Sequence, residues 1–287
     1  MVNGMPGPMA TAAAEACLRK NMDLCPFAIT GPDMSPQTIT VTDPDTKRTA
    51  TVNLIPSSDM PTITSLLPNH QPNLIAIDYT HPSAVNSNAD YYAKNKIPFV
   101  MGTTGGDRDA LISSVTEPKP HYCVIAPNMG KQIVAMQYAL TTLEEQFPGA
   151  FQGYNLEVVE SHQKKKADTS GTAVAVIGSI KGMIGEKDSD GFRNPEDVVL
   201  LRDDKSSSDF GVPSEYLDAG HAFHTYTLTS GDGSVEFELK HNVCGRRVYA
   251  DGTADAVKFL RKVIGEKGEG GARVYSMIDV LKEGALE

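Results

Sequence analysis

The chain has 287 residues, which is enough for two domains at the usual ~100–200 residues per domain. Its formal net charge of −10 argues against a nucleic acid partner, because phosphate binding needs a basic face. No apolar run approaches the ~18 residues of a membrane span, so we expect no membrane partner. The cysteines are scattered without a CxxC pair or a histidine at ligand spacing, so we expect free thiols and no bound metal: Cys17, Cys25, Cys123 and Cys244.

The first part of the chain, residues 1–127, alternates short apolar runs with helical stretches, as in a parallel doubly wound sheet of the α/β class. The pair at 38–41 and 50–54 could form a hairpin. The expected elements are a strand at Val2, a helix at Ala10–Lys20, strands at Phe27–Thr30, Thr38–Val41, Ala50–Leu54 and Asn73–Tyr79, a helix at Pro82–Lys94, and strands at Pro98–Met101 and His121–Ala126. Either the first strand is very short or the natural polypeptide begins earlier.

After Asn128 the pattern changes, and from Val198 to His241 the expected strands follow one another without helices between them, which predicts a second, α+β domain with a mixed or antiparallel sheet. The expected elements are a helix at Met129–Phe147, a strand at Leu156–Glu160, a helix at Ala173–Ile184, strands at Val198–Arg202, Ala222–Thr229 and Ser234–His241, and helices at Ala254–Ile264 and Val274–Lys282. The polar segment Asp203–Pro213 is expected to be a mobile loop. We place the first domain at 1–127 plus 246–287 and the second at 128–245.

A glycine turn follows the first strand: Gly4, Met5, Pro6, Gly7, Pro8 and Met9. Glycine lets the backbone approach a pyrophosphate, and the next helix offers free N–H groups with the positive end of its dipole. Pro8 suits the first helical turn, where its missing N–H costs nothing. The structural alternative is an ordinary strand–helix turn. The position at the start of an alternating pattern favours a dinucleotide site of the Rossmann type.

Two further loops follow neighbouring predicted strands: Gly102, Thr103 and Thr104, and then Ala126, Pro127, Asn128 and Met129. Open α/β sheets bind ligands at the carboxyl ends of their strands, although a glycine-rich loop can also be a plain connection. The strand at 27–30 carries no carboxylate at its tip to hold a ribose hydroxyl. That absence favours NADPH, with NADH as the alternative.

The most specific segment is Glu160–Thr172 (ESHQKKKADTSGT), which leaves a strand and enters a helix. Ser170, Gly171 and Thr172 supply an N-cap hydroxyl, a side-chain-free approach and helix N-terminal N–H groups, which together can hold a carboxylate. Lys166 adds a cation and a proton, and His162 could donate or relay a proton. The alternative is a solvated basic loop that caps a helix.

This segment resembles the signature of the dihydrodipicolinate reductase family, and in particular its plant and algal branch. The resemblance runs almost the whole length of the chain. It includes DYTHPSAVNSNADYY (78–92), PFVMGTTGGDR (98–108), EQFPGAF (145–151), GHAFHTYTLTS (220–230), HNVCGRR (241–247) and MIDVLKEG (277–284).

The resemblance implies NAD(P)H-dependent reduction of a hydroxylated dihydrodipicolinate precursor to tetrahydrodipicolinate, in lysine biosynthesis through diaminopimelate. It places the proton donor on His162, the catalytic lysine on Lys166 and the substrate carboxylate on Ser170-Gly171-Thr172. It also implies a homodimer or homotetramer that assembles through the second domain, in the plastid stroma of a photosynthetic source and otherwise in the cytoplasm.

The chain departs from the bacterial pattern of that family at Gln163 and in its loop, which in bacterial members is one residue longer before Ser-Gly-Thr. Bacterial members carry a second histidine where this chain has Gln163, so a contact of Gln163 with substrate is implied only by position. Pro6 and Pro8 are unusual in the first glycine turn. Two other functions compete: a sugar-type dehydrogenase, against which the order Glu117-Pro118-Lys119-Pro120 speaks, and a nucleotide sensor without catalysis.

Overall fold

The computed structural model describes residues 1–69, 73–185 and 198–283. The chain divides into two compact units, one formed by Met1–Val134 with Arg247–Glu287 and the other by Ala135–Arg246. The domain boundaries that we placed at residues 127/128 and 245/246 stay a prediction. Within the described residues, no helix combines the length and the hydropathy needed to cross a membrane.

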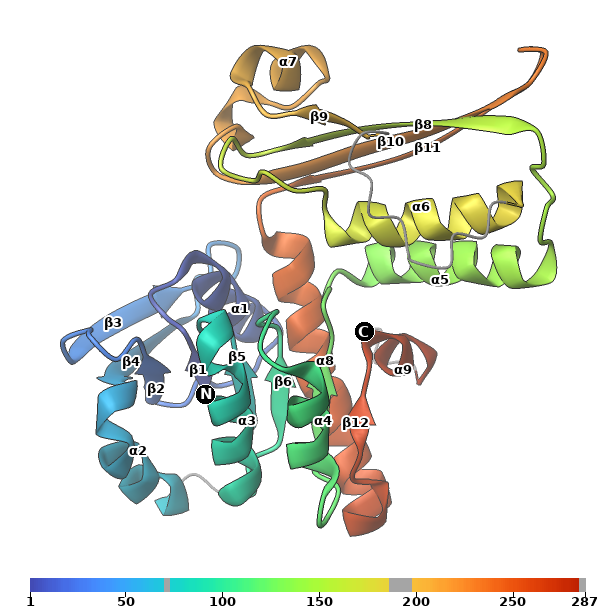
Figure 1. Ribbon diagram of the computed structural model, residues 1–287. Coiled ribbons are helices and arrows are strands. Elements are labelled where there is room, and N and C mark those ends of the chain that lie inside the picture. Colours follow the sequence, from blue (N-terminus) through green and yellow to red (C-terminus); the bar gives the residue numbers. More distant parts are fainter. Residues whose placement is uncertain (70–72, 186–197, 284–287) are drawn as a thin grey trace. The chain divides into compact units, whose positions relative to one another are not determined.

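The first unit is built on a five-stranded sheet in which every neighbouring pair is parallel (Figure 1). In spatial order its strands are β1 (Val2–Asn3), β5 (Ala76–Asp78), β6 (Phe99–Met101), β7 (Cys123–Ile125) and β12 (Val274–Tyr275). All residues of the three central strands are buried, as their continuous apolar sequences predict for a sheet covered on both faces. The expected parallel α/β sheet is confirmed.

A separate three-stranded sheet lies beside β1. It consists of β2 (Phe27–Thr30), β4 (Thr49–Pro56) and β3 (Gln37–Thr42), and β3 and β4 form the antiparallel hairpin that the sequence predicts. Between β1 and β2 the backbone of Gly4 donates to Ile29 O at 2.9 Å, and the side chain of Asn3 accepts from Ile29 N at 2.9 Å. The buried Asn3 amide therefore takes the place of a regular strand ladder at this point.

Helices pack around these sheets. In the first unit they are α1 (Pro8–Arg19), α2 (Met60–Leu66), α3 (Val85–Lys94), α4 (Arg108–Thr116), α8 (Arg247–Lys267) and α9 (Met277–Lys282), with short 3-10 helices at Ser57–Asp59, Leu67–Asn69, Pro82–Ala84 and Gly268–Gly271. The helix expected at 274–282 is wrong in its first residues, because Val274 and Tyr275 pair with β7 as β12. The helix α9 starts only after Ser276, whose side chain and Asp279 form a capping box.

The second unit has a four-stranded mixed sheet, as the sequence predicts. Its order is β11 (Glu236–Cys244), β10 (His221–Ser230), β8 (Tyr154–His162) and β9 (Val198–Leu201), with antiparallel pairs except between β8 and β9. Helices α5 (Lys131–Gln146) and α6 (Gly171–Ile184) lie along one face of the sheet (Figure 1). Buried apolar side chains of α6, β8 and β10 form the core between them, including Val158, Val176, Ile177, Ile180 and Tyr226.

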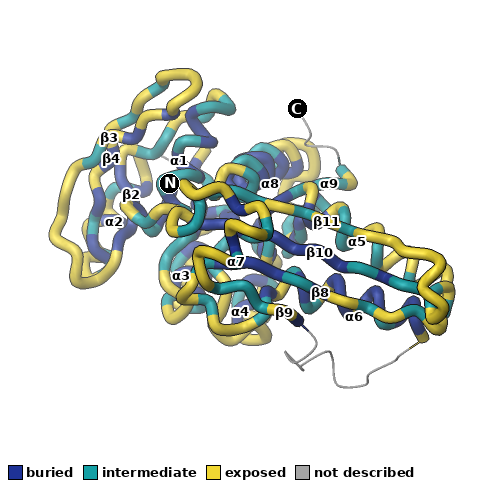
Figure 2. Tube along the Cα trace, turned by 90° about the horizontal axis from the view of Figure 1, so that it is seen from above, coloured by how far each residue is buried: buried dark blue, intermediate teal, exposed yellow. Residues whose placement is uncertain are grey.

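The opposite face of this sheet is turned to the viewer in Figure 2, with α5 and α6 behind it. Part of the segment expected to be a mobile loop, 203–213, forms the helix α7 (Asp204–Asp209), so that prediction is wrong. The helix is fixed at its start because Asp203 caps it by accepting from Ser206 N at 2.9 Å. It is also fixed to the sheet, where Ser161 Oγ donates to Ser207 Oγ at 2.9 Å. A 3-10 helix at Ser214–Tyr216 follows it.

Candidate active site

In the first unit, the turn after β1 has no room for a side chain at either of its glycines, Gly4 and Gly7. Gly4 has a φ of +98°, and a Cβ added to it would lie 2.1 Å from Tyr79 O. Thr30 Oγ1 donates to Met5 O at 2.8 Å and fixes the turn to the end of β2. Gly7 is the N-cap of α1 and offers no capping side chain, so the first-turn N–H groups of this helix suit an anionic ligand.

The loop after β6 is organised by a buried carboxylate, Asp78, at the end of β5. Asp78 accepts hydrogen bonds from Thr80 Oγ1 (2.7 Å), Thr103 Oγ1 (2.8 Å) and Tyr92 OH (2.6 Å). A Cβ added to Gly102 would lie 2.4 Å from the ring of Tyr79, so glycine is needed here for close packing. The sequence analysis did not single out Asp78, although its position directly after an apolar strand was a usable signal.

The three expected cofactor loops, 4–9, 102–104 and 126–129, each follow a strand of one parallel sheet, so they lie at the same edge of it. In the third loop Asn128 Oδ1 accepts from Gly130 N at 2.8 Å. By contrast, Glu117–Pro120 precedes β7 and lies at the opposite end of the strands. This position speaks against a catalytic role for Lys119 of the sugar-dehydrogenase kind.

In the second unit, the buried carboxylate of Glu160 holds the end of β8 to the start of α6. Its Oε1 forms an ion pair with the guanidinium of Arg202, and its Oε2 accepts from Ser170 N at 3.1 Å. Burial raises the pKa of Glu160, but hydrogen bonds from His224, Ser170 N–H and Arg202 outweigh it and lower the pKa to about 2. Glu160 is therefore a carboxylate at neutral pH.

His162 ends β8 and is buried beside His224. The two Nε2 atoms are 3.3 Å apart, and the rings meet edge to face with centroids 5.1 Å apart. Burial and the nearby charge of His224 lower the pKa of His162 to about 3, although Glu160 opposes this. At neutral pH His162 is thus a neutral imidazole, which can donate a hydrogen bond but holds no extra proton.

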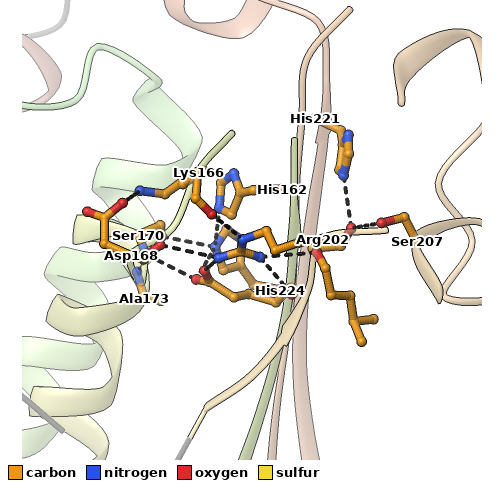
Figure 3. Close-up of polar contacts among 12 residues, drawn as sticks. His162, Lys166, Asp168, Ser170, Ala173, Arg202, Ser207, His221 and His224 are labelled. Carbon is orange, nitrogen blue, oxygen red and sulfur yellow. Dashed lines mark hydrogen bonds and ion pairs between the residues drawn. The ribbon is translucent and has the colours of Figure 1, made fainter. Parts of the chain in front are cut away.

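Lys166 supplies the cation of this cluster, and its side chain lies next to His162 in Figure 3. Its Nζ is 2.8 Å from Asp168 Oδ1, with side-chain exposures of 27% and 82% for the two residues. Such solvent-exposed pairs contribute only ~0–1 kcal/mol, so the ammonium can turn to a ligand at little cost. The backbone is more firmly held, because Lys166 O accepts from Arg202 Nε at 2.6 Å.

The turn at the start of α6 begins with the N-cap that the sequence predicts, and its role as an anion site stays a prediction. Ser170 is the N-cap, and its Oγ accepts from Ala173 N at 3.0 Å. A Cβ added to Gly171 would meet no atom within 4 Å, so no internal contact requires glycine there. Thr172 occupies the next helical position. The side chain of Gln163 reaches Gly220, where an added Cβ would lie 3.0 Å from its amide nitrogen, and its contact with substrate stays a prediction.

The site residues Glu160, His162 and His224 place one potential metal-ligand atom each within 4.8 Å of one another. Both oxygens of Glu160 already accept hydrogen bonds, and the guanidinium of Arg202 would repel a dication. Hydrogen bonding therefore accounts for this arrangement. The sequence analysis assigned no role to Glu160, Arg202 or His224. Glu160 and His224 each lie in a strand next to an apolar residue, which was a usable signal, whereas Arg202 follows the end of β9.

The low pKa of His162 predicts an acid-sensitive fold. Its pKa is depressed from 6.5 to about 3 in the folded state, so below pH 6.5 only the unfolded chain takes up this proton. We expect His162 to account for about 2 kcal/mol of lost stability between pH 7 and pH 5, by proton linkage. Urea unfolding at both pH values measures this loss. The free energy of unfolding should depend less on pH in His162→Gln, whereas a substitution of the exposed His81, His81→Gln, should keep the wild-type dependence. An equal slope in all three proteins would contradict the assignment.

Two family models match this chain. The one described as "Dihydrodipicolinate reductase, N-terminus" covers residues 1–129, and the one described as "Dihydrodipicolinate reductase, C-terminus" covers residues 133–281. The chain belongs to the dihydrodipicolinate reductase family. This confirms the resemblance that the signature segment indicated.

Curated members of the dihydrodipicolinate reductase family give the same assignment. The chain is 46% identical to "4-hydroxy-tetrahydrodipicolinate reductase 2, chloroplastic" of Arabidopsis thaliana over 287 residues, which is 100% of this chain and 78% of that protein. It is 42% identical to a probable chloroplastic enzyme of the same name from Oryza sativa subsp. japonica, over 100% of this chain and 83% of that protein. A bacterial relative from Herminiimonas arsenicoxydans is 30% identical over 71% of this chain and 72% of that protein. The plant-like character is therefore confirmed.

A solved structure shares the family fold. It is a dipicolinate-bound dihydrodipicolinate reductase from Paenisporosarcina sp. TG-14, with a TM-score of 0.61 and 17% identity over 96% of this chain and 95% of that one.

Proposed function

We propose that this protein catalyses the NADPH-dependent reduction of 4-hydroxy-tetrahydrodipicolinate to tetrahydrodipicolinate, a step of lysine biosynthesis through diaminopimelate. The observation that carries the proposal is the cluster at the start of α6, where Lys166, His162 and the Ser170 cap surround one helix N-terminus. The family membership and the names of the relatives support it.

The overall reaction removes one water from the ring and adds one hydride and one proton. Bound NADPH supplies the hydride. The first unit would hold the pyrophosphate of NADPH at the Gly4–Met9 turn and the start of α1. The glycines there leave room for a phosphate, and the N–H groups at the start of the helix have no capping side chain.

In the second unit, the ring carboxylate would accept hydrogen bonds at the first turn of α6, from Gly171 N–H and the Thr172 hydroxyl. Lys166 would deliver the proton to the ring carbon that gains negative charge as hydride adds. Neutral His162 would donate a hydrogen bond to the substrate, which orients the ring. Reaction requires that the two units bring the nicotinamide and the ring into contact.

The choice of NADPH over NADH rests on the end of β2, where Thr30 is followed by Gly31 rather than by a carboxylate. We infer a homodimer or homotetramer that assembles through the sheet of the second unit, whose strand β9 exposes 49% of Val199. The names of the plant relatives support the plastid stroma as its compartment in a photosynthetic source, and the cytoplasm otherwise.

A coupled assay tests the function directly. The product of the preceding synthase is supplied fresh, and the oxidation of NADPH or NADH is followed with and without pyridine-2,6-dicarboxylate as a competitor. Turnover with competitive inhibition supports the proposal. Nucleotide binding without turnover would point to a sensor instead.

Gly171→Ala separates substrate binding from folding. The added methyl has open space in the protein, so we expect no loss of stability. The added methyl would collide with a substrate carboxylate at the start of the helix. Such overpacking costs ~1–3 kcal/mol of binding free energy, which should raise KM for substrate about tenfold. KM for NADPH should not change. Gly178→Ala, in the same helix and equally unobstructed, is the control and should leave both constants unchanged. Equal effects on both substrates would remove this turn from the substrate site.

A further inference from the structure

His224 is the centre of a buried polar cluster that the proposed reaction does not use directly. Its Nε2 lies 3.0 Å from Ser170 Oγ, 3.3 Å from His162 Nε2 and 3.5 Å from Glu160 Oε2 (Figure 3). The other nitrogen, Nδ1, is buried and has no hydrogen-bond partner among the described residues. The ring is stacked on His241, with centroids 4.5 Å apart and planes 12° apart.

These contacts decide whether Nε2 of His224 carries a hydrogen. A proton on Nδ1 would be a buried donor without an acceptor, which is unfavourable. A proton on Nε2 faces a carboxylate, a hydroxyl oxygen and an imidazole nitrogen. Since Glu160 is ionised and fixed by Arg202, its charge favours the second arrangement. His224 therefore carries its proton on Nε2.

That proton sets the state of His162. Two N–H groups cannot point at each other across 3.3 Å, so Nε2 of His162 must present its lone pair to His224. The single proton of neutral His162 is then on Nδ1. The hydroxyl of Ser170 is oriented in the same way, because its oxygen faces both Ala173 N–H and His224 Nε2–H. Its own hydrogen is left to donate.

We propose that Glu160 and His224 are positioning residues that lock His162 in the tautomer protonated on Nδ1, so that His162 and Ser170 both present donors to an anionic ligand. The role in turnover rests on the proposed function, whereas the tautomer itself does not. His162 then acts as a hydrogen-bond donor toward the substrate and not as a general base.

Nitrogen-15 NMR of the labelled, full-length protein at pH 7 tests the tautomer without any assay of activity. Two-bond proton–nitrogen correlation spectra distinguish protonated from bare ring nitrogens. The signals of His162 are assigned by their loss in His162→Gln. We expect Nδ1 of His162 to be protonated and Nε2 bare in the wild type. The opposite pattern, or a metal ion retained on these nitrogens, would overturn the proposal.

Matched variants then test the cause. His224→Leu removes the donor and should turn His162 into a mixture of tautomers. His224→Gln places an amide N–H near the position of Nε2 and should restore the Nδ1 form. His221→Gln, on the same strand, is the control, because the His221 ring bonds to Ser161 and Tyr216 instead. A His162 tautomer unchanged in a folded His224→Leu protein would overturn the assignment, and Glu160→Gln offers an independent variant if that protein does not fold.

In turnover, His224→Leu should lower kcat by about 10–100-fold, the usual effect of removing a partner that orients a functional imidazole. His224→Gln should recover most of this loss. If the tautomer changes as expected while kcat does not, the positioning stands and the role of His162 in the reaction is wrong. If the enzyme turns over nothing in any form, the proposed function fails while the tautomer assignment remains measurable.

Discussion

Lys166→Ala is expected to lower kcat by about 10²–10⁴-fold, the range for loss of a proton donor in the transition state. Because His162 is a neutral imidazole at pH 7, Lys166 is the proton donor that we propose for this cluster. Stability should hardly change, because the side chain pairs only with an exposed carboxylate and its backbone bond to Arg202 is kept. Steady-state kinetics on the synthase product, with NADPH saturating, measures the effect.

Lys164→Ala is the matched control for this variant. Lys164 is in the same loop and forms the same type of exposed ion pair, with Asp204 at 2.6 Å, but it contacts none of the cluster. It should keep wild-type turnover within a few-fold. A similarly small effect of Lys166→Ala would mean that the proton comes from elsewhere, for example from water.

Gly4→Ala is expected to destabilise the first unit strongly. Its Cβ would lie 2.1 Å from Tyr79 O, and its φ of +98° is unfavourable for alanine. We expect a loss of about 2–5 kcal/mol in the free energy of unfolding, from backbone strain and overpacking together. Denaturant unfolding measures it, and KM for NADPH should rise in the protein that remains folded.

Gly265→Ala in α8 is the control, since a Cβ at that position meets no atom within 4 Å. It should be neutral or stabilising, because alanine is a better helix former than glycine by about 1 kcal/mol. If Gly4→Ala were as stable as this control, the close approach of Gly4 to the carbonyl of Tyr79 would be wrong.

The comparison of these glycines shows where sequence reasoning succeeds and where it stops. The sequence identifies Gly4 as a residue that must be glycine, and it assigns the reason to the approach of a pyrophosphate. The structure adds a different reason, the carbonyl of Tyr79, a contact across 75 residues that no local pattern reveals. Regular elements were predictable because apolar periodicity is local. Val274–Tyr275 and the α7 segment were not, because a strand pairing and a cap decide them.

The candidate site likewise contains residues that the local sequence reveals and residues that only long-range strand pairing brings together. His162, Lys166 and Ser170 lie within nine residues of one another, so their shared chemistry is visible in the sequence. Glu160 and His224 come together only because β8 and β10 pair in the register that sets these two residues opposite each other. That register depends on the whole sheet. The groups that would contact the substrate can therefore be predicted from the sequence, whereas the residues that hold them in place cannot.

The hydrogen bonds around Asp78 have a consequence for ligand affinity. Thr103 Oγ1 donates to Asp78 Oδ1, and the N–H groups of Gly102 and Thr103 donate to Asp78 O, so contacts internal to the protein tie the start of the loop after β6 to the end of β5. The conformational entropy of this loop is therefore lost during folding and not again when a nucleotide associates. Discrimination between the two reduced nucleotides must then come from the groups that each one touches, and not from different degrees of loop ordering.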